Sequence, residues 1–213
     1  MVMRLVIPLA ILLSACCHEA SGQARKFGFQ QLTESEGLSQ NFVYGLKEDA
    51  RGFLWASTGA GLSRYDGYEI KRFTSRDSLC ADFITADYST SSGYLLFGHN
   101  NGGVTIFDGL QFKKLLPDTL GNKISSITES SSNFFWIATQ SRGLMFVDYI
   151  NNRISLVSPP ELEGKIINVI FARGDILWVG TNEGLLLFRI KGNSLTILSN
   201  ELLPSFVSVN AIL

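Results

Sequence analysis

Hydrophobic and polar residues alternate along most of the chain in short runs separated by turn residues. The first such unit divides into NFVYGLKED, FLWAST, GLSRYD and YEIKRFT, which begin at Asn41, Phe53, Gly61 and Tyr68. Each run is rich in β-branched or aromatic residues, and Gly, Asn or Asp lies at the joins, which is typical of short strands. No apolar pattern with helical periodicity follows the first 24 residues, so the sequence predicts an all-β protein.

This unit recurs with a period near 40 residues. The anchor position of each unit is held by Trp55, Leu96, Trp136 and Trp178. The protein has only 3 tryptophans, and all of them occupy this position. A second apolar position precedes each anchor by the same interval, at Val43, Ile84, Ile124 and Ile166. Four short strands repeated at this period predict the four-stranded antiparallel blades of a β-propeller.

The turn residues also repeat. A threonine follows the anchor at Thr58, Thr139 and Thr181, whereas the second unit has His99 there. Asp66-Gly67 and Asp108-Gly109 predict hairpins with type I′ turns, in which both central residues have positive φ. Asn151-Asn152 and Gly192-Asn193 occupy comparable positions in the later units.

Both ends of the repeat region predict an incomplete ring. Residues 26–33 resemble a lone fourth strand, and residues 203–213 resemble the first strand of a fifth unit. We therefore expect residues 25–213 to form a partial propeller of about four blades plus the first strand of a fifth. This arrangement indicates the N-terminal fragment of a longer protein.

Residues 1–24 predict a signal peptide. Arg4 precedes an apolar run from Leu5 to Ala15 that is short for a membrane span. Two processing routes fit the sequence: cleavage after the small residues that end at Ala24, or a lipoprotein box that ends at Cys16 and would be lipidated there. Either route predicts a periplasmic or cell-envelope protein, attached to a membrane only through its leader, a lipid or a missing segment.

Composition narrows the classes of partner. The formal net charge is -1 and the hydrophobic fraction is 46%, so a sizeable core is expected and nucleic acid is not an expected partner. Cys80 is the only cysteine beyond the leader, so we expect no internal disulfide and no cysteine metal site. Its predicted role is that of a small buried hydrophobic residue.

Candidate catalytic groups are few. Gly59-Ala60-Gly61 lacks the Lys-Ser/Thr pair of a phosphate loop. Asp66, Asp108 and Asp148 suit turns better than a ring of metal ligands. His18 lies in the leader and His99 lies in a β repeat, as a loop residue or one facing a ligand. We expect no catalytic, cofactor or metal site.

Ligand contacts are expected where the repeat is broken. The tryptophans could stack on sugars, but their identical placement favours packing between blades. Residues that depart from the repeat are better candidates for the ligand face. These are Arg51, Arg64, His99 and Arg142.

The first unit resembles the two-component regulator propeller repeat. The resemblance is carried by Gly37-Leu38-Ser39, Asp49 with Gly52, Trp55 with Thr58, and Gly61-Leu62 leading to Tyr65-Asp66-Gly67. It extends over about residues 27–213 and is weakest in the second unit, where Leu96 and His99 replace the usual Trp and Thr.

The resemblance implies a periplasmic ligand-sensing domain of a bacterial, Bacteroidetes-type sensor histidine kinase. In that family the propeller has seven blades, is often doubled, and precedes a β-sandwich, a membrane helix and an output module. The implied partners are a small-molecule ligand, such as a glycan fragment, and that C-terminal output module. The alternative is a standalone exported or lipid-anchored propeller that acts as a binding or scaffold protein, and a propeller enzyme is a third class.

Overall fold

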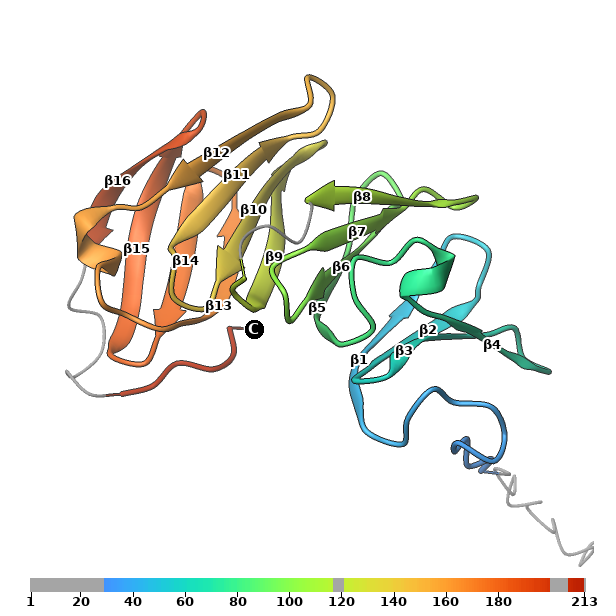
Figure 1. Ribbon diagram of the computed structural model, residues 1–213. Coiled ribbons are helices and arrows are strands. Elements are labelled where there is room, and N and C mark those ends of the chain that lie inside the picture. The colour runs from blue at the N-terminus through green and yellow to red at the C-terminus, as the bar shows by residue number, and fades with distance from the viewer. Residues whose placement is uncertain (1–28, 117–120, 200–206, 213) are drawn as a thin grey trace, which may run out of the picture. The chain divides into compact units, whose positions relative to one another are not determined.

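The structure, a computed structural model, describes residues 29–116, 121–199 and 207–212 (Figure 1). The chain divides into a short N-terminal unit, residues 1–31, and a main unit, residues 32–213. The described part of the first unit, residues 29–31, has no regular secondary structure. The predicted signal peptide and Cys16 lie outside the described residues.

The main unit contains four sheets, each of four antiparallel strands joined in chain order. Blade one has β1 (Val43–Glu48), β2 (Leu54–Thr58), β3 (Gly61–Tyr65) and β4 (Ile70–Phe73). Blade two has β5 (Ile84–Ser89), β6 (Leu95–His99), β7 (Val104–Phe107) and β8 (Phe112–Leu116). Blade three has β9 (Ile124–Ser131), β10 (Phe134–Thr139), β11 (Leu144–Asp148) and β12 (Arg153–Val157). Blade four has β13 (Ile167–Arg173), β14 (Ile176–Thr181), β15 (Gly184–Lys191) and β16 (Ser194–Ser199).

Within residues 29–116, 121–199 and 207–212, two single-turn 3-10 helices, η1 (Ser75–Asp77) and η3 (Pro160–Leu162), lie between blades. The predicted all-β architecture of four-stranded blades is confirmed. The first strands of successive blades, β1, β5, β9 and β13, contact one another in chain order (Figure 1). Among the described residues the blades do not close into a ring.

Each anchor residue packs against the blade that follows it. Trp55 lies in one apolar cluster with Leu95, Phe97 and Phe107 of blade two. Leu96 and Trp136 lie in the corresponding clusters with residues of blades three and four. All three anchors are 0% exposed. The predicted packing role of the anchors is therefore confirmed for these blades, whereas Trp178 of blade four is only partly buried.

Residues 207–212 take the place of the first strand of a fifth blade, without forming a regular strand. The Val209 amide donates to the Thr181 carbonyl at 2.9 Å. The Val209 side chain packs on Gly180 as that of Ile124 packs on Gly98. At the other end, the described part of the predicted strand over 26–33 is irregular, and a turn over 34–37 follows it.

One detail of the predicted repeat is wrong. Ile167, not Ile166, is equivalent to Ile124, because Ile167 pairs with Thr181 as Ile124 pairs with Thr139. Phe171 lies seven positions before its partner Trp178, whereas Thr128 lies eight before Trp136, so the β13–β14 hairpin is one residue shorter.

The Asp-Gly hairpins are not type I′ turns. Gly67 and Gly109 have positive φ, but Asp66 and Asp108 do not. Each aspartate instead accepts two backbone N–H groups of a four-residue loop through its Oδ1 atom, from Tyr68 and Glu69 in blade one and from Leu110 and Gln111 in blade two. Asp148 likewise accepts from the backbone of Asn151.

Small residues two positions after the anchors allow the blades to approach closely. They are Ser57, Gly98, Ala138 and Gly180. A Cβ atom on Gly98 would lie 2.5 Å from Cγ2 of Ile124 in the next blade. Real Cβ contacts are longer than this, so any larger side chain here must separate blades two and three.

Gly98→Val should lower the free energy of unfolding by about 1–3 kcal/mol, because overpacking a close interface forces strain on both sides. Urea denaturation followed by circular dichroism measures this loss. Adding Ile124→Ala should recover part of the loss, since it removes the clashing methyl group. Strictly additive losses from the two substitutions would contradict the packing described for this interface.

Candidate functional site

The innermost strand of blade two carries a charged side chain at a position where the repeat is otherwise apolar. Asp87 of β5 pairs with Phe97, the residue after the anchor. The equivalent residues in the other three blades are Leu46, Ile127 and Ile170. Asp87 is thus the one acidic residue at a repeat position that three blades fill with an aliphatic side chain.

Asp87 is held by contacts from blade one. Lys47 Nζ lies 3.1 Å from Asp87 Oδ1, and the Ser57 hydroxyl donates to Asp87 Oδ2 at 2.9 Å. The Asp87 side chain is 8% exposed, whereas that of Lys47 is 32% exposed. A Cβ atom at position 45 would lie 1.8 Å from Asp87 Oδ2, so Gly45 is the residue that makes room for the carboxylate.

A hollow of about 140 Å³ opens beside this pair. Hydroxyl groups from three blades line it together with Asp87, and its polar lining residues are Tyr44, Ser57, Thr85, Asp87, Ser125 and Ser126. Tyr44 and Thr85 sit at β-bulges near the start of their strands. We call the group formed by Tyr44, Lys47, Ser57, Thr85, Asp87 and Ser125 the inner junction.

The inner junction offers a cation, a carboxylate and several hydroxyls within a small space. Thr85 Oγ1 donates to the Ile124 carbonyl at 2.7 Å and so also joins blade two to blade three. This set of groups can bind a small polar ligand through hydrogen bonds and charge. The inner junction has no histidine or cysteine, the residues that most often act as general base or nucleophile in acyl transfer.

The four residues predicted for the ligand face do not form one site. Arg51 and Arg64 both stack on Phe53 of blade one, with guanidinium-to-ring distances of 5.1 and 4.6 Å. Arg142 is exposed in the β10–β11 turn of blade three. His99 is 0% exposed at the end of β6. The prediction that His99 faces a ligand is therefore wrong, whereas Arg51, Arg64 and Arg142 stay predictions.

His99 is neither a loop residue nor exposed to a ligand. Its Nε2 atom makes a 2.8 Å hydrogen bond with Thr105 Oγ1 inside blade two. In the other blades the threonine at this position donates to the carbonyl of the glycine that begins the next strand or precedes it. Burial is the main cause that lowers the pKa of His99 to about 4.

The repeated aspartates act in turns. Hydrogen bonds from Lys113 and from the Gln111 and Leu110 backbone lower the pKa of Asp108 to about 2. The Glu69 and Tyr68 amides lower the pKa of Asp66. Among the residues that the structure describes, no group of three or more His, Cys, Asp or Glu side chains could hold a metal ion.

The inner junction was not predicted from the sequence, although a signal for it existed. Aligning the four units by their anchors places Asp87 in a column with Leu46, Ile127 and Val169. A charged residue in an otherwise aliphatic column of a buried strand indicates either a paired charge or a binding site. The sequence places Lys47 in the same unit as Trp55, but only the structure shows that the Lys47 side chain faces Asp87 of the next blade.

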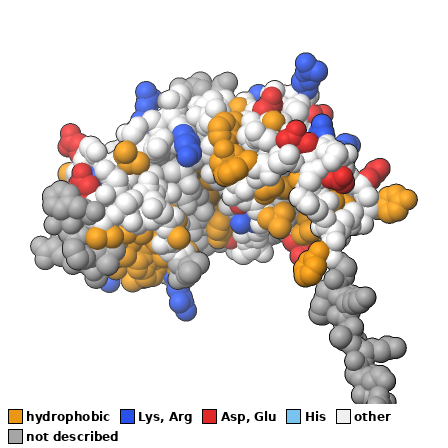
Figure 2. Space-filling view, turned by 90° about the horizontal axis from the view of Figure 1, so that it is seen from below, with side chains coloured by type: hydrophobic (Ala, Val, Ile, Leu, Met, Phe, Trp, Pro, Cys, Tyr) orange, Lys and Arg blue, Asp and Glu red, His pale blue; other side chains and the backbone are white. Residues whose placement is uncertain are grey.

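Charge elsewhere is dispersed. Figure 2 shows charged side chains of both signs scattered among apolar patches on one face, rather than gathered into a region of one sign. That face presents no continuous basic stripe of the kind that a phosphate backbone requires.

Comparison with known proteins supports the resemblance seen in the repeat. The model of the two component regulator propeller family matches residues 37–60, which contain β1 and β2. Histidine kinase P4 of Formosa agariphila is 36% identical over 61 residues, which is 29% of this chain and 4% of the kinase.

Solved structures share the propeller fold. The extracellular domain of a putative hybrid two-component system from B. thetaiotaomicron superposes with a TM-score of 0.66 at 21% identity, over 80% of this chain and 26% of that one. A second such domain from B. thetaiotaomicron has a TM-score of 0.60 at 19% identity, over 78% of this chain and 24% of that one. The chain spans about a quarter of the length of these two extracellular domains.

The same fold also occurs in an enzyme. A streptogramin B lyase has a TM-score of 0.62 at 17% identity, over 78% of this chain and 57% of the lyase. The fold alone therefore does not decide between sensing and catalysis. No helix within the described residues is long and apolar enough to cross a membrane.

Proposed function

We propose that the chain is part of the periplasmic ligand-binding propeller of a two-component sensor. It is exported by its N-terminal signal peptide, binds a small ligand such as a glycan fragment, and passes the binding event to a C-terminal output module of the same protein. The repeat matched at residues 37–60 and the propeller fold shared with extracellular two-component domains support this proposal.

The inner junction is the observation that carries the proposal. Burying a carboxylate costs free energy, and an apolar residue of similar size at such a position is often neutral or stabilising. Blades three and four have isoleucine at the position of Asp87, so the fold itself does not require a charge there. A charge that the repeat does not need, beside a polar hollow, indicates a role in binding.

Replacing the three polar residues of the inner junction with apolar ones tests this separation of folding from function. The variant Lys47→Leu/Ser57→Ala/Asp87→Val should unfold within about 1 kcal/mol of the wild type, or be more stable, because all buried charges are removed together. Asp87→Val alone should be less stable than the triple variant, since it leaves the Ser57 hydroxyl unpaired. A loss of about 3 kcal/mol or more in the triple variant would show that the cluster serves the fold.

Binding itself is measured by thermal unfolding of the full chain with a panel of sugars: glucose, galactose, cellobiose, maltose, galacturonic acid and glucosamine. A sugar present at a hundred times its Kd should stabilise the wild type by about 2.7 kcal/mol. The triple variant should show no such shift. If no sugar of the panel stabilises the wild type, the proposal that the ligand is a glycan fragment is wrong. If a sugar stabilises the triple variant as much as the wild type, the ligand does not bind at the inner junction.

A further inference from the structure

In blade one a carboxylate accepts a hydrogen bond from the indole of the anchor tryptophan, and blade three has no carboxylate at the corresponding position. Trp55 Nε1 donates to Asp49 Oδ2 at 2.9 Å. Asp49 lies two residues after Lys47, the residue that pairs with Trp55. In blade three the anchor Trp136 pairs with Thr128, so the residue two positions on is Ser130, which lies at a β-bulge between Glu129 and Ser131.

Ser130 does not replace that carboxylate. Its hydroxyl donates to the Phe134 carbonyl of its own hairpin at 3.4 Å. Trp136 is 0% exposed, and within the described part of the chain its Nε1 atom has no hydrogen-bond partner. A buried donor left unpaired lowers stability, so an acceptor that reaches it gains correspondingly.

A hollow of about 330 Å³ lies beside Ser130. Hairpin ends of blades three and four line it, through Ser130, Ser131, Phe134, Phe146, Asp175 and Ile190. Phe146 packs on Trp136 with ring centroids 5.1 Å apart, and Phe134 stacks on Phe146 at 5.7 Å. The aromatic wall of the hollow therefore lies against Trp136, and Ser130 lies on the side to which the equivalent indole of blade one points.

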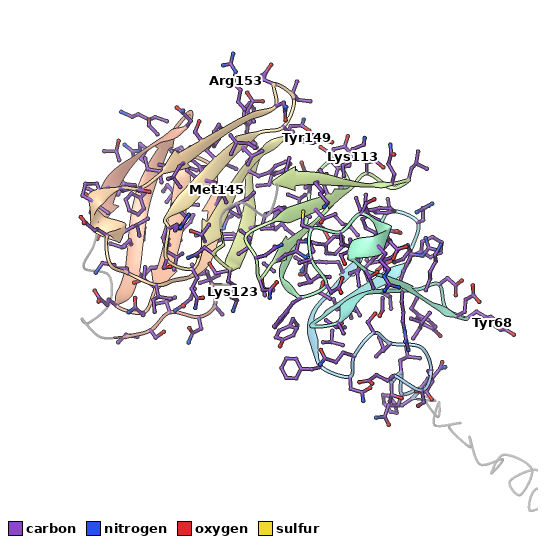
Figure 3. The ribbon with its side chains drawn as sticks, in the orientation of Figure 1. Tyr68, Lys113, Lys123, Met145, Tyr149 and Arg153 are labelled. Carbon is purple, nitrogen blue, oxygen red and sulfur yellow. The ribbon has the colours of Figure 1, made fainter. Side chains whose placement is uncertain are left out.

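The hollow is at the opposite end of blade three from Lys123, which precedes β9. Figure 3 places Tyr149 and Arg153, on the β11–β12 hairpin, at one end of this blade and Lys123 at the other. The Tyr149 amide donates to the Asn133 carbonyl of the β9–β10 turn, so both turns lie at the same end. The lining residues are distinct from those of the inner junction.

The lining defines the class of ligand. Phe134, Phe146 and Ile190 provide an apolar wall. Trp136 is not itself a lining residue, but it packs on Phe146 and carries the unpaired donor. Asp175 is paired with Arg189 at 3.2 Å, so this pair brings no net charge to the rim. We propose that this hollow binds a small uncharged molecule with a flat apolar body and a carbonyl oxygen that accepts from Trp136 Nε1. This second site goes beyond the sensor function proposed above and does not depend on it.

Acetophenone and isopropylbenzene form a matched pair of probes, because they have nearly the same shape and only the first has an acceptor. The full chain labelled with ¹⁵N is titrated with each, and the indole resonances are followed by NMR, with Trp136→Phe used for assignment. Acetophenone should shift the Trp136 indole resonance and bind about ten-fold more tightly than isopropylbenzene, as expected for one added hydrogen bond. The Trp55 indole should not respond.

Ser130→Asp should abolish acetophenone binding, because it supplies the carboxylate of blade one within the protein. Ser132→Asp is the matched control, with the same charge two residues away and outside the lining of the hollow, and should retain binding. If Ser130→Asp does not fold, Trp136→Phe provides the test instead. This variant should lose the ten-fold preference for acetophenone over isopropylbenzene. Equal binding of the two probes, no shift of the Trp136 indole, or an unchanged preference in Trp136→Phe would each overturn the proposal.

Discussion

Replacing Trp55 with alanine should lower the free energy of unfolding by about 3–5 kcal/mol, as expected for truncating a fully buried aromatic residue. Trp55 is 0% exposed, and its ring lies 4.8 Å from that of Phe107 and 6.2 Å from that of Phe97, both in blade two. The substitution also leaves Asp49 Oδ2 without the indole that donates to it. Urea denaturation followed by far-ultraviolet circular dichroism measures the loss.

Trp178→Ala is the matched control, since it removes the same side chain from the same repeat position. In blade four the anchor is only partly buried, and its aromatic neighbour is Phe171 of its own blade at 5.7 Å. We expect a loss of about 1 kcal/mol, because less apolar area returns to water. Equal losses in the two variants would contradict the finding that each anchor is stabilised by the following blade.

Acidification should destabilise the fold through His99. Its pKa is about 4 in the folded chain because burial disfavours the imidazolium, against an ordinary value of 6.5. Between these values the unfolded chain binds more protons than the folded chain, so stability is complete above pH 6.5 and falls as the pH decreases towards 4. A difference of this size corresponds to about 3 kcal/mol.

His99→Thr restores the residue that the other blades have at this position and isolates the histidine contribution. Urea midpoints measured from pH 7.5 to pH 4 should decline steeply for the wild type and much less for the variant. Lower stability of the variant at pH 7.5 is compatible with this expectation, because only the slope reports the titration. Parallel pH profiles for the two proteins would contradict a buried neutral His99.

The sequence was sufficient to predict the blades because their determinants are local and repeat. Alternation, turn residues and the recurring anchor predicted four strands per unit, and the strands of blade one begin within two residues of the predicted runs. The packing role of Trp55 and Trp136 also followed from repetition, since a position that recurs in every unit serves the contact that every unit makes. Exact turn geometry did not follow, because Asp66 and Asp108 bind the loop backbone with their side chains.

The candidate site was beyond these local signals. His99 was predicted as a candidate because it departs from the repeat, but it is buried inside blade two, where it makes a hydrogen bond with Thr105. Asp87 is an equally clear departure, yet its importance depends on Lys47 and Ser57 in another blade. Contacts between blades depend on the bulges and on the small residues that let the first strands approach. Sequence spacing within one unit does not specify them.

Residues that break the repeat are therefore of two kinds. Some, such as His99, are absorbed into the core of a single blade and affect stability. Others face a neighbouring blade or a hollow, as Asp87 and Ser130 do. Only the second kind can meet a ligand, and the two hollows described here lie beside such residues.

Ligand recognition at the inner junction is tested most directly by the backbone ¹H–¹⁵N NMR spectrum of the full chain. The titrant is whichever sugar of the panel gives the largest thermal shift. The predicted result is a set of perturbations centred on β1, β5 and the start of β9, around Lys47, Asp87 and Ser125, that is absent from the triple apolar variant. Perturbations centred on other blades, or unchanged in that variant, would contradict the inner junction as the ligand site.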